Sequence, residues 1–145
     1  SHGIFTEVEM RARYAIHLEA YNKIVAIEAK TMLDMAQHQI LPAAIHYCRA
    51  LCDAVGTKQH VGASHRAESR IITQLSGHTD ALYDTVEALS NAMSVVPKDA
   101  EKASMYYRNE VIPVMEQMRR HADVLEALTD KNYWPYPTYS DLLFY

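Results

Sequence analysis

The chain has 145 residues, which suits one domain large enough to build its own hydrophobic core. Hydrophobic residues make up 49% of the chain, and 18 acidic residues against 14 basic ones give a net charge of −4. This composition excludes intrinsic disorder, and it argues against nucleic acid or an anionic membrane as a partner, because both attract a basic surface. Only four glycines and five prolines leave little material for the turns of a many-stranded β fold.

The pattern of apolar residues predicts an all-α fold, an antiparallel up-down-up bundle of three long helices with an extended aromatic tail. We expect the bundle over residues 4–132 and the tail over residues 133–145, with residues 1–3 a tag remnant. No apolar run approaches the roughly 20 residues of a membrane span, and no signal peptide opens the chain. We therefore expect a cytoplasmic protein in which Cys48 and Cys52 are reduced thiols.

The first helix is predicted over residues 7–55. Thr6 and Glu9 form the pattern of a capping box, and Gly56 is expected to stop the helix. Pro42 cannot donate a backbone hydrogen bond, so we expect a kink there rather than a break. The apolar positions of this helix spread beyond one stripe, so its excess apolar surface is either exposed or covered by something else.

The second helix is predicted to begin near Ser64, and it carries the cleanest periodicity in the chain. Its apolar positions step alternately by three and four residues, the spacing of a coiled-coil-like seam with one polar interruption at Thr79. The seam consists of Ile72, Leu75, Thr79, Leu82, Val86, Leu89, Met93 and Val96.

The third helix follows a turn over residues 96–99, with Asp99 as its N-cap. Pro113 lies inside this helix and predicts a second kink. The two connecting loops are short, so neighbouring helices should run antiparallel. The apolar positions of this helix are Ala100, Ala103, Tyr107, Val111, Val114, Met118, Leu125 and Leu128.

The tail differs in composition from the rest of the chain. Pro135 and Pro137 disfavour helix and favour an extended path. Four tyrosines, the only tryptophan and one of the two phenylalanines fall within residues 133–145. Aromatic side chains in an extended segment each bury a large area when they dock, so we interpret the tail as a docking segment.

Metal and catalytic chemistry has little support in the sequence. Helical bundles that hold two metal ions use Glu-x-x-His motifs, and no glutamate here has a histidine three residues later. His46, Cys48 and Cys52 are the only compact group of soft ligands, but a structural zinc site needs four ligands. Core or near-surface cysteines are the favoured alternative, because a buried free cysteine behaves as a small hydrophobe. We therefore predict no catalytic, cofactor-binding or metal-ligating residue in this chain.

Three polar residues interrupt the apolar run of the first helix. Glu28, Thr31 and Asp34 follow one another at intervals of three residues and lie on roughly one face. A solvated stripe is the favoured interpretation. The alternative is a polar contact with another domain, because buried polar groups must be paired.

Two stretches of the chain resemble a known family, the type III glutamine synthetases. The first resembles the segment after that family's catalytic core, and it comprises Arg13-Tyr14, Leu18-Glu19-Ala20-Tyr21, Ile27 to Ala36 (IEAKTMLDMA) and Ile40-Leu41-Pro42-Ala43. The second, Tyr133 to Phe144 (YWPYPTYSDLLF), resembles the family's extreme C-terminus. The region between them is similar only in its helical pattern. Taken together, the two motifs and this region extend the resemblance over essentially the whole chain.

The resemblance implies that this chain is the C-terminal helical domain of a large cytoplasmic enzyme. That enzyme makes glutamine from glutamate, ammonia and ATP through a γ-glutamyl phosphate, with Mg or Mn as the divalent metal. In the family, active sites form between neighbouring subunits of a ring, and two rings stack into a dodecamer. The residues that bind ATP, metal and glutamate lie upstream of the segment that this chain resembles, so the chain alone is expected to be catalytically silent.

We therefore expect a structural role in packing against the catalytic domain and neighbouring subunits. The residues expected to make these contacts are Glu28, Thr31, Asp34, Trp134, Tyr136, Tyr139, Leu142, Leu143 and Phe144. One alternative is a free-standing helical adaptor that binds a partner through the same surfaces. A weaker alternative is a metal- or ligand-binding bundle that uses His46, Cys48 and Cys52.

Overall fold

The computed structural model of the chain describes residues 6–137. Throughout this range the only regular structure is helix, which confirms the all-α class. The elements, with η marking π-helical turns, are α1 (Glu7–Met35), η1 (Ala36–Ile40), α2 (Leu41–Val61), α3 (Arg66–Ser94), α4 (Ala100–Tyr106), η2 (Tyr107–Val111) and α5 (Ile112–Leu128). None of these helices is both long enough and apolar enough to cross a membrane.

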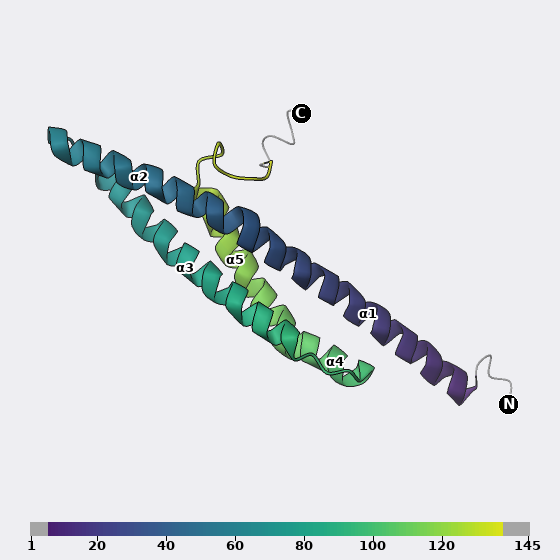
Figure 1. Cartoon of the computed structure of the whole chain (residues 1–145). Coiled ribbons are helices and arrows are strands. Elements are labelled where there is room, and N and C mark those ends of the chain that lie inside the picture. Colours follow the sequence, from purple (N-terminus) through teal and green to yellow (C-terminus); the bar gives the residue numbers. More distant parts are fainter. Residues whose placement is uncertain (1–5, 138–145) are drawn as a thin grey trace.

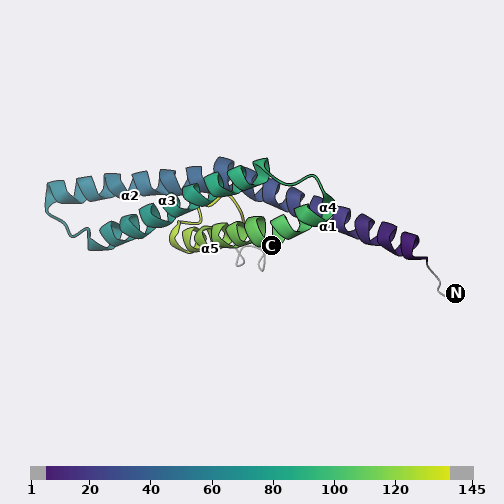
Figure 2. The ribbon, with the colours of Figure 1, turned by 90° about the horizontal axis from the view of Figure 1, so that it is seen from below.

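The helices form three rods. The first, α1–η1–α2, is a single long helical rod, and the second, α3, packs against both α2 and α5 (Figure 1). The third, α4–η2–α5, follows a short loop, and its α4 portion packs against α1. In both views the first turns of α1 project beyond the other helices (Figure 2). This projecting part of α1 therefore has little of the bundle beside it.

Side-chain caps define two of the helix starts as the sequence predicts. The Thr6 hydroxyl accepts a hydrogen bond from the Glu9 amide at 3.1 Å, and the Glu9 carboxylate accepts one from the Thr6 amide at 3.4 Å, which completes a capping box. The Asp99 carboxylate accepts a bond from the Lys102 amide at 3.1 Å and caps α4. Both caps satisfy amide groups that have no partner within the helix.

The end of the first rod is a correction to the sequence prediction. Gly56 does not stop the helix, which continues to Val61. The stop is Gly62, which has a positive φ of 74° and donates its amide to the Gln59 carbonyl at 3.3 Å. A left-handed residue after the last turn is the usual C-terminal signal, and glycine adopts it without a steric penalty. The next rod starts at Arg66, two residues after the predicted position.

Both interior prolines follow a π-helical turn. Pro42 is the second residue of α2, directly after η1, and Pro113 is the second residue of α5, directly after η2. A proline removes one backbone donor, and its ring crowds the carbonyl of the preceding turn. A wider turn is a known way for a helix to absorb such an interruption, and here the helical rod continues through each proline.

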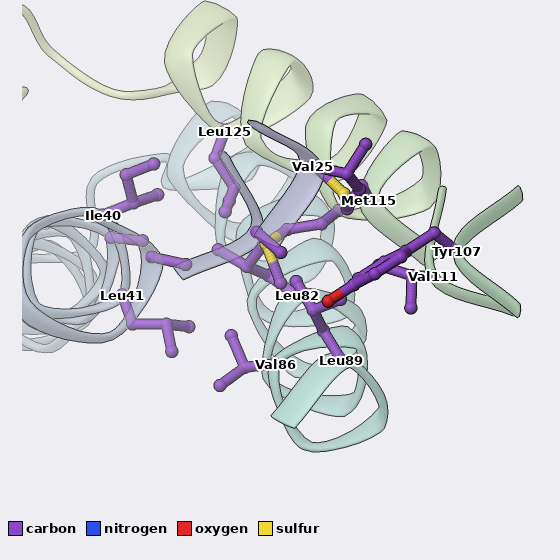
Figure 3. Packing of buried hydrophobic residues seen from close by; sticks show 14 of the residues in the cluster. Val25, Ile40, Leu41, Leu82, Val86, Leu89, Tyr107, Val111, Met115 and Leu125 are labelled. Carbon is purple, nitrogen blue, oxygen red and sulfur yellow. The ribbon is translucent and has the colours of Figure 1, made fainter. Parts of the chain in front are cut away.

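The core lies between α3 and the other two rods. Leu75, Leu82 and Leu89 of the predicted seam are fully buried and recur every seven residues. The facing rod buries a second series with the same interval, Val111, Met118 and Leu125. Figure 3 shows side chains from α1, α2, α3 and α5 converging on this region. Each fully buried side chain of this kind contributes about 1.5–3 kcal/mol relative to an exposed one.

Candidate interaction site

The side of α1 that faces away from the core carries apolar residues. Ile16, Ala20, Ile24 and Ile27 follow one another at intervals of four, four and three residues, so they form a stripe along the helix. The exposed fractions of the isoleucines are 63%, 56% and 56%, whereas Val25 on the other side is buried. We call these four residues the outer face of α1. An unpartnered stripe of large apolar side chains is typical of an interaction surface.

The projecting start of α1 is also apolar. Val8, Met10 and Tyr14 are all exposed, and they belong to the first turns of α1. The sequence alone leaves open whether the excess apolar surface of this helix is exposed or covered. Within residues 6–137 this surface is exposed, so any cover must come from outside that range.

The three polar residues singled out in the first helix lie on the surface. Glu28, Thr31 and Asp34 are all exposed. The Thr31 hydroxyl donates to the Ile27 carbonyl at 2.9 Å, and an Asp34 carboxylate oxygen lies 3.8 Å from Nε2 of His38 in an exposed pair. These contacts lie within the α1–η1 rod. The arrangement favours a solvated stripe beside the outer face of α1, and the contact with another domain stays a prediction.

The segment after α5 turns back towards the bundle at Asp130. The Asp130 carbonyl accepts hydrogen bonds from the amides of Tyr133 at 2.9 Å and Trp134 at 3.2 Å, and its carboxylate accepts one from the Asn132 amide at 2.9 Å. An aspartate that bonds the backbone two residues later commonly nucleates a tight turn. The segment therefore reverses direction before its prolines.

The aromatic residues at the start of the tail pack on this chain's own helices. The rings of Tyr133 and Tyr47 of α2 have centroids 5.3 Å apart, and Trp134 has an exposed fraction of only 8%. Tyr136 meets Trp134 edge-on at 6.4 Å, and burial together with the Asp34 carboxylate raises the pKa of Tyr136. Tyr133 thus lies against α2, and Tyr136 lies near the end of α1. Tyr139, Leu142, Leu143 and Phe144 lie outside the described residues.

Two polar atoms of the tail are buried without a partner. Nε1 of Trp134 and the hydroxyl of Tyr136 find no acceptor or donor within residues 6–137. A buried donor without a hydrogen bond costs about 1–3 kcal/mol. Within residues 6–137, Trp134 and Tyr136 are therefore packed for their apolar area rather than for hydrogen bonds.

Of the soft ligands noted in the sequence, Cys48 and Cys52 lie beside each other, and burial together with the neighbouring Cys48 raises the pKa of the Cys52 thiol. The thiol of Cys48 lies 3.8 Å from the Ser76 hydroxyl, whereas Cys52 and His46 are exposed. Within the described part of the chain, no group of three or more His, Cys, Asp or Glu side chains is placed to hold a metal ion. The structure therefore gives no support to a metal site built on His46, Cys48 and Cys52.

Sequence reasoning missed a pair of histidines between α3 and α5. The Nδ1 atoms of His78 and His121 lie 3.1 Å apart, and both side chains are half-buried. Burial, the neighbouring His78 and the Arg120 guanidinium all lower the pKa of His121. Each histidine lies about one helical turn from an apolar position of its helix, which the sequence shows. That the two histidines face each other follows only once the register of the two helices is known.

Comparison with known proteins identifies the relatives of this chain. The family described as "Glutamine synthetase C-terminal domain" matches residues 1–59. The chain is 30% identical to a glutamine synthetase of Butyrivibrio fibrisolvens over 99% of its own length and 21% of the relative. It is 28% identical to one of Bacteroides fragilis (strain YCH46), covering 97% of the chain and 20% of the relative. The type-3 glutamine synthetase of Dictyostelium discoideum is 27% identical over 98% of the chain and 20% of the relative.

These matches confirm the resemblance that was based on the two motif segments. The family match includes the whole first segment, and the three relatives align over almost the entire chain, tail included. The chain spans about a fifth of the length of these curated relatives.

Proposed function

The chain is a C-terminal domain of the glutamine synthetase family, and from that premise we propose that it is a non-catalytic structural part of a larger enzyme. The parent enzyme joins ammonia to glutamate at the expense of ATP, with Mg or Mn as the metal. ATP, metal and glutamate bind outside this domain. The domain itself acts in the cytoplasm by packing against the catalytic domain and neighbouring subunits of a ring-shaped assembly, a dodecamer in the family that it resembles.

The outer face of α1 is the observation that carries this proposal. Three isoleucines with more than half of their surface in water, on a helix already packed on its other side, leave apolar area that a partner would bury. Covering each isoleucine would contribute about 1.5–3 kcal/mol. A domain that covers about a fifth of its relatives' length has an obvious source for that partner in the rest of the enzyme.

Exposed polar residues border this surface and would give it specificity. Glu28, Thr31 and Asp34 lie exposed beside the outer face. Thr31 and Asp34 have local contacts with Ile27 and His38, which they could exchange for hydrogen bonds to a partner. Charged rims of this kind orient a partner more than they add affinity. The up-down-up arrangement, with bends at the two prolines, would hold this surface on a rigid support.

The tail would extend the same contact. Tyr133, Trp134 and Tyr136 anchor its first part on the bundle, with Tyr136 near Asp34 of α1. From there Tyr139, Leu142, Leu143 and Phe144 would dock on the catalytic domain or a neighbouring subunit. The unpartnered Nε1 of Trp134 and hydroxyl of Tyr136 support a tail whose hydrogen-bond partners come from outside residues 6–137.

Site-specific photocrosslinking in the full-length enzyme tests the proposal. A photoreactive phenylalanine analogue in place of Ile24, on the outer face, should crosslink to peptides outside this domain. The same analogue in place of Tyr83, which is exposed on α3, is the matched control. Crosslinks from position 24 to the catalytic domain, absent from position 83, support the interface. If position 24 gives only crosslinks within this domain, the outer face is not an interface.

The competing function is a free-standing helical adaptor. An immunoblot of the source organism's lysate with an antibody against this domain separates the two. A band several times heavier than this 145-residue chain is what the enzyme requires, and a band of the chain's own size would instead favour the adaptor.

A further inference from the structure

The side of α3 that faces away from the core carries a regular stripe of polar residues. Its members follow one another at alternating intervals of four and three residues, which places them in a nearly straight line along the helix. We call this line the α3 stripe, and it consists of Arg66, Arg70, Thr73, Gly77, Asp80, Asp84 and Glu87. All of them are exposed, whereas Leu75, Leu82 and Leu89 on the opposite side of the helix are fully buried. In Figure 1, α3 runs along one edge of the bundle.

The charges of the α3 stripe are sorted by sign along the helix. Its first two members are arginines, its last three are acidic, and Thr73 and Gly77 between them are uncharged. Within residues 6–137, neither the arginines nor the acidic residues of the stripe form a salt bridge. A helix face that is basic at one end and acidic at the other is complementary to a copy of itself turned end to end.

We propose that the α3 stripes of two copies of this chain pack antiparallel across a two-fold axis. In this arrangement Arg66 lies opposite the partner's Asp84, and Arg70 lies opposite the partner's Asp80. The axis repeats both contacts with the roles of the two copies exchanged. A parallel pair would instead place like charges opposite each other, which is unfavourable. The α3 stripe is separate from the outer face of α1, so this contact goes beyond the proposed function.

The spacing of the stripe determines the register of the pair. Each step of four or three residues forward along one helix is matched by the same step back along the other. The layer after Arg66 and the partner's Asp84 therefore joins Arg70 to the partner's Asp80, and the next joins Thr73 to the partner's Gly77. Layers of this kind are how two helices with a seven-residue repeat keep one face in contact.

The uncharged middle of the stripe allows the two helices to approach closely. A Cβ added to Gly77 would meet no other part of the bundle within 4 Å, so this position opens onto free space. Ser69, Ser76 and Ala81 beside the stripe are also small. Glycine lets another backbone come near, and close helices bring arginine within reach of paired hydrogen bonds to a carboxylate.

The contact is expected to be weak and sensitive to salt. Ion pairs between exposed side chains contribute little individually, and one pair of helix faces is a small interface. Salt screens such pairs, because the Debye length falls from about 10 Å at 0.1 M to about 3 Å at 1 M. The dimer should therefore form at low ionic strength and dissociate as the salt concentration rises.

Sedimentation equilibrium of the 145-residue chain tests the proposal. The wild type should dimerise at an ionic strength of about 0.02 M, and about 0.5 M salt should weaken the dimer at least tenfold. Arg66→Glu/Arg70→Glu and Asp80→Arg/Asp84→Arg should each be monomeric under the low-salt conditions. Arg108→Glu/Arg119→Glu changes the charge by the same amount as the first variant at exposed positions of the third rod. This control should dimerise as the wild type does.

Mixing the two stripe variants tests the antiparallel pairing itself. The stripe is wholly acidic in Arg66→Glu/Arg70→Glu and wholly basic in Asp80→Arg/Asp84→Arg, so the mixture should form a heterodimer although neither variant pairs with itself. Circular dichroism melts show whether each variant is folded, and if one is not, the other decides by comparison with the wild type and the control. A wild type that is monomeric at low salt, a folded stripe variant that still dimerises, or a mixture of folded variants that stays monomeric would overturn the proposal.

Discussion

The ring of Tyr133 lies 5.3 Å from the ring of Tyr47, with the two planes tilted by 49°. These residues are far apart in the sequence, and their contact joins the segment after α5 to α2. Burial, Asp130 and Tyr133 together raise the pKa of Tyr47, as expected for a phenol that is partly removed from water beside a carboxylate. The start of the tail is therefore an integral part of the bundle.

Trp134→Ala should destabilise the chain by about 3 kcal/mol. The indole has an exposed fraction of 8%, and truncation of a buried tryptophan typically costs 3–5 kcal/mol. The lower end is expected because Nε1 has no hydrogen bond to lose within residues 6–137. Urea unfolding followed by far-UV circular dichroism measures the change. Tryptophan fluorescence cannot be used, because Trp134 is the only tryptophan and the variant lacks it. Tyr83→Ala, at an exposed site, should change the stability by less than about 0.5 kcal/mol.

Deleting residues 138–145 from the full-length enzyme should weaken its assembly without unfolding this domain. The deletion keeps Tyr133, Trp134 and Tyr136, which make the described contacts with the bundle. Light scattering should therefore show a shift to smaller particles, while the domain retains its melting temperature. Deletion of residues 134–145 removes the anchor as well and should lower both. A shorter deletion that leaves the mass distribution unchanged would contradict a docking role for the end of the tail.

Two glycines of the α2 region should respond to alanine in opposite directions. Gly62 has a φ of 74°, where a Cβ is strained, so Gly62→Ala should cost about 1 kcal/mol. Gly56 lies inside α2 with no atom within 4 Å of an added Cβ, so Gly56→Ala should gain about 0.5–1 kcal/mol. Chemical denaturation of both variants measures the difference. If both substitutions changed the free energy of unfolding with the same sign, the first rod would not end at Val61.

Stability should fall as the pH decreases below about 6.5, the ordinary pKa of histidine. The folded chain lowers the pKa of His121, so between that lowered value and 6.5 the unfolded chain binds more protons. Protons therefore favour unfolding in this window, and the contribution of His121 is complete only above it. Urea midpoints at pH 7.5 and 5.5, with a chelator present, measure the effect. His121→Gln should reduce the decline, and an equally steep decline in this variant would exclude His121 as its source.

Local chemistry predicted the starts of the helices well and one of the ends poorly. The Thr6 and Asp99 caps depend on residues within one turn, so the sequence alone contains them. Gly56 and Gly62 offer the same local signal. Gly62 is the one with a positive φ, and Lys58 of the added turn pairs with Glu68 of α3, a contact that the local pattern does not reveal. The seam of α3 was predicted correctly because burial of Leu75, Leu82 and Leu89 depends on periodicity alone.

The long-range contacts could not be predicted in the same way. Tyr133 meets Tyr47 because the turn at Asp130 reverses the chain, a geometry that the two prolines of the tail do not reveal. His78 and His121 meet only in one register of α3 against α5. The outer face of α1 was foreseen as excess apolar surface, but its position required knowing which side α3 and α4 cover.

The double variant Ile24→Glu/Ile27→Glu in the full-length enzyme tests the central claim most directly. It places two charges on the outer face of α1, at side chains that are 56% exposed and make no part of the core. The mass distribution by light scattering is the measurement, with Tyr83→Glu as the control. We expect the double variant to lose assembled particles while the control and the melting temperature of the domain stay unchanged. An assembly of wild-type mass in the double variant would contradict the account.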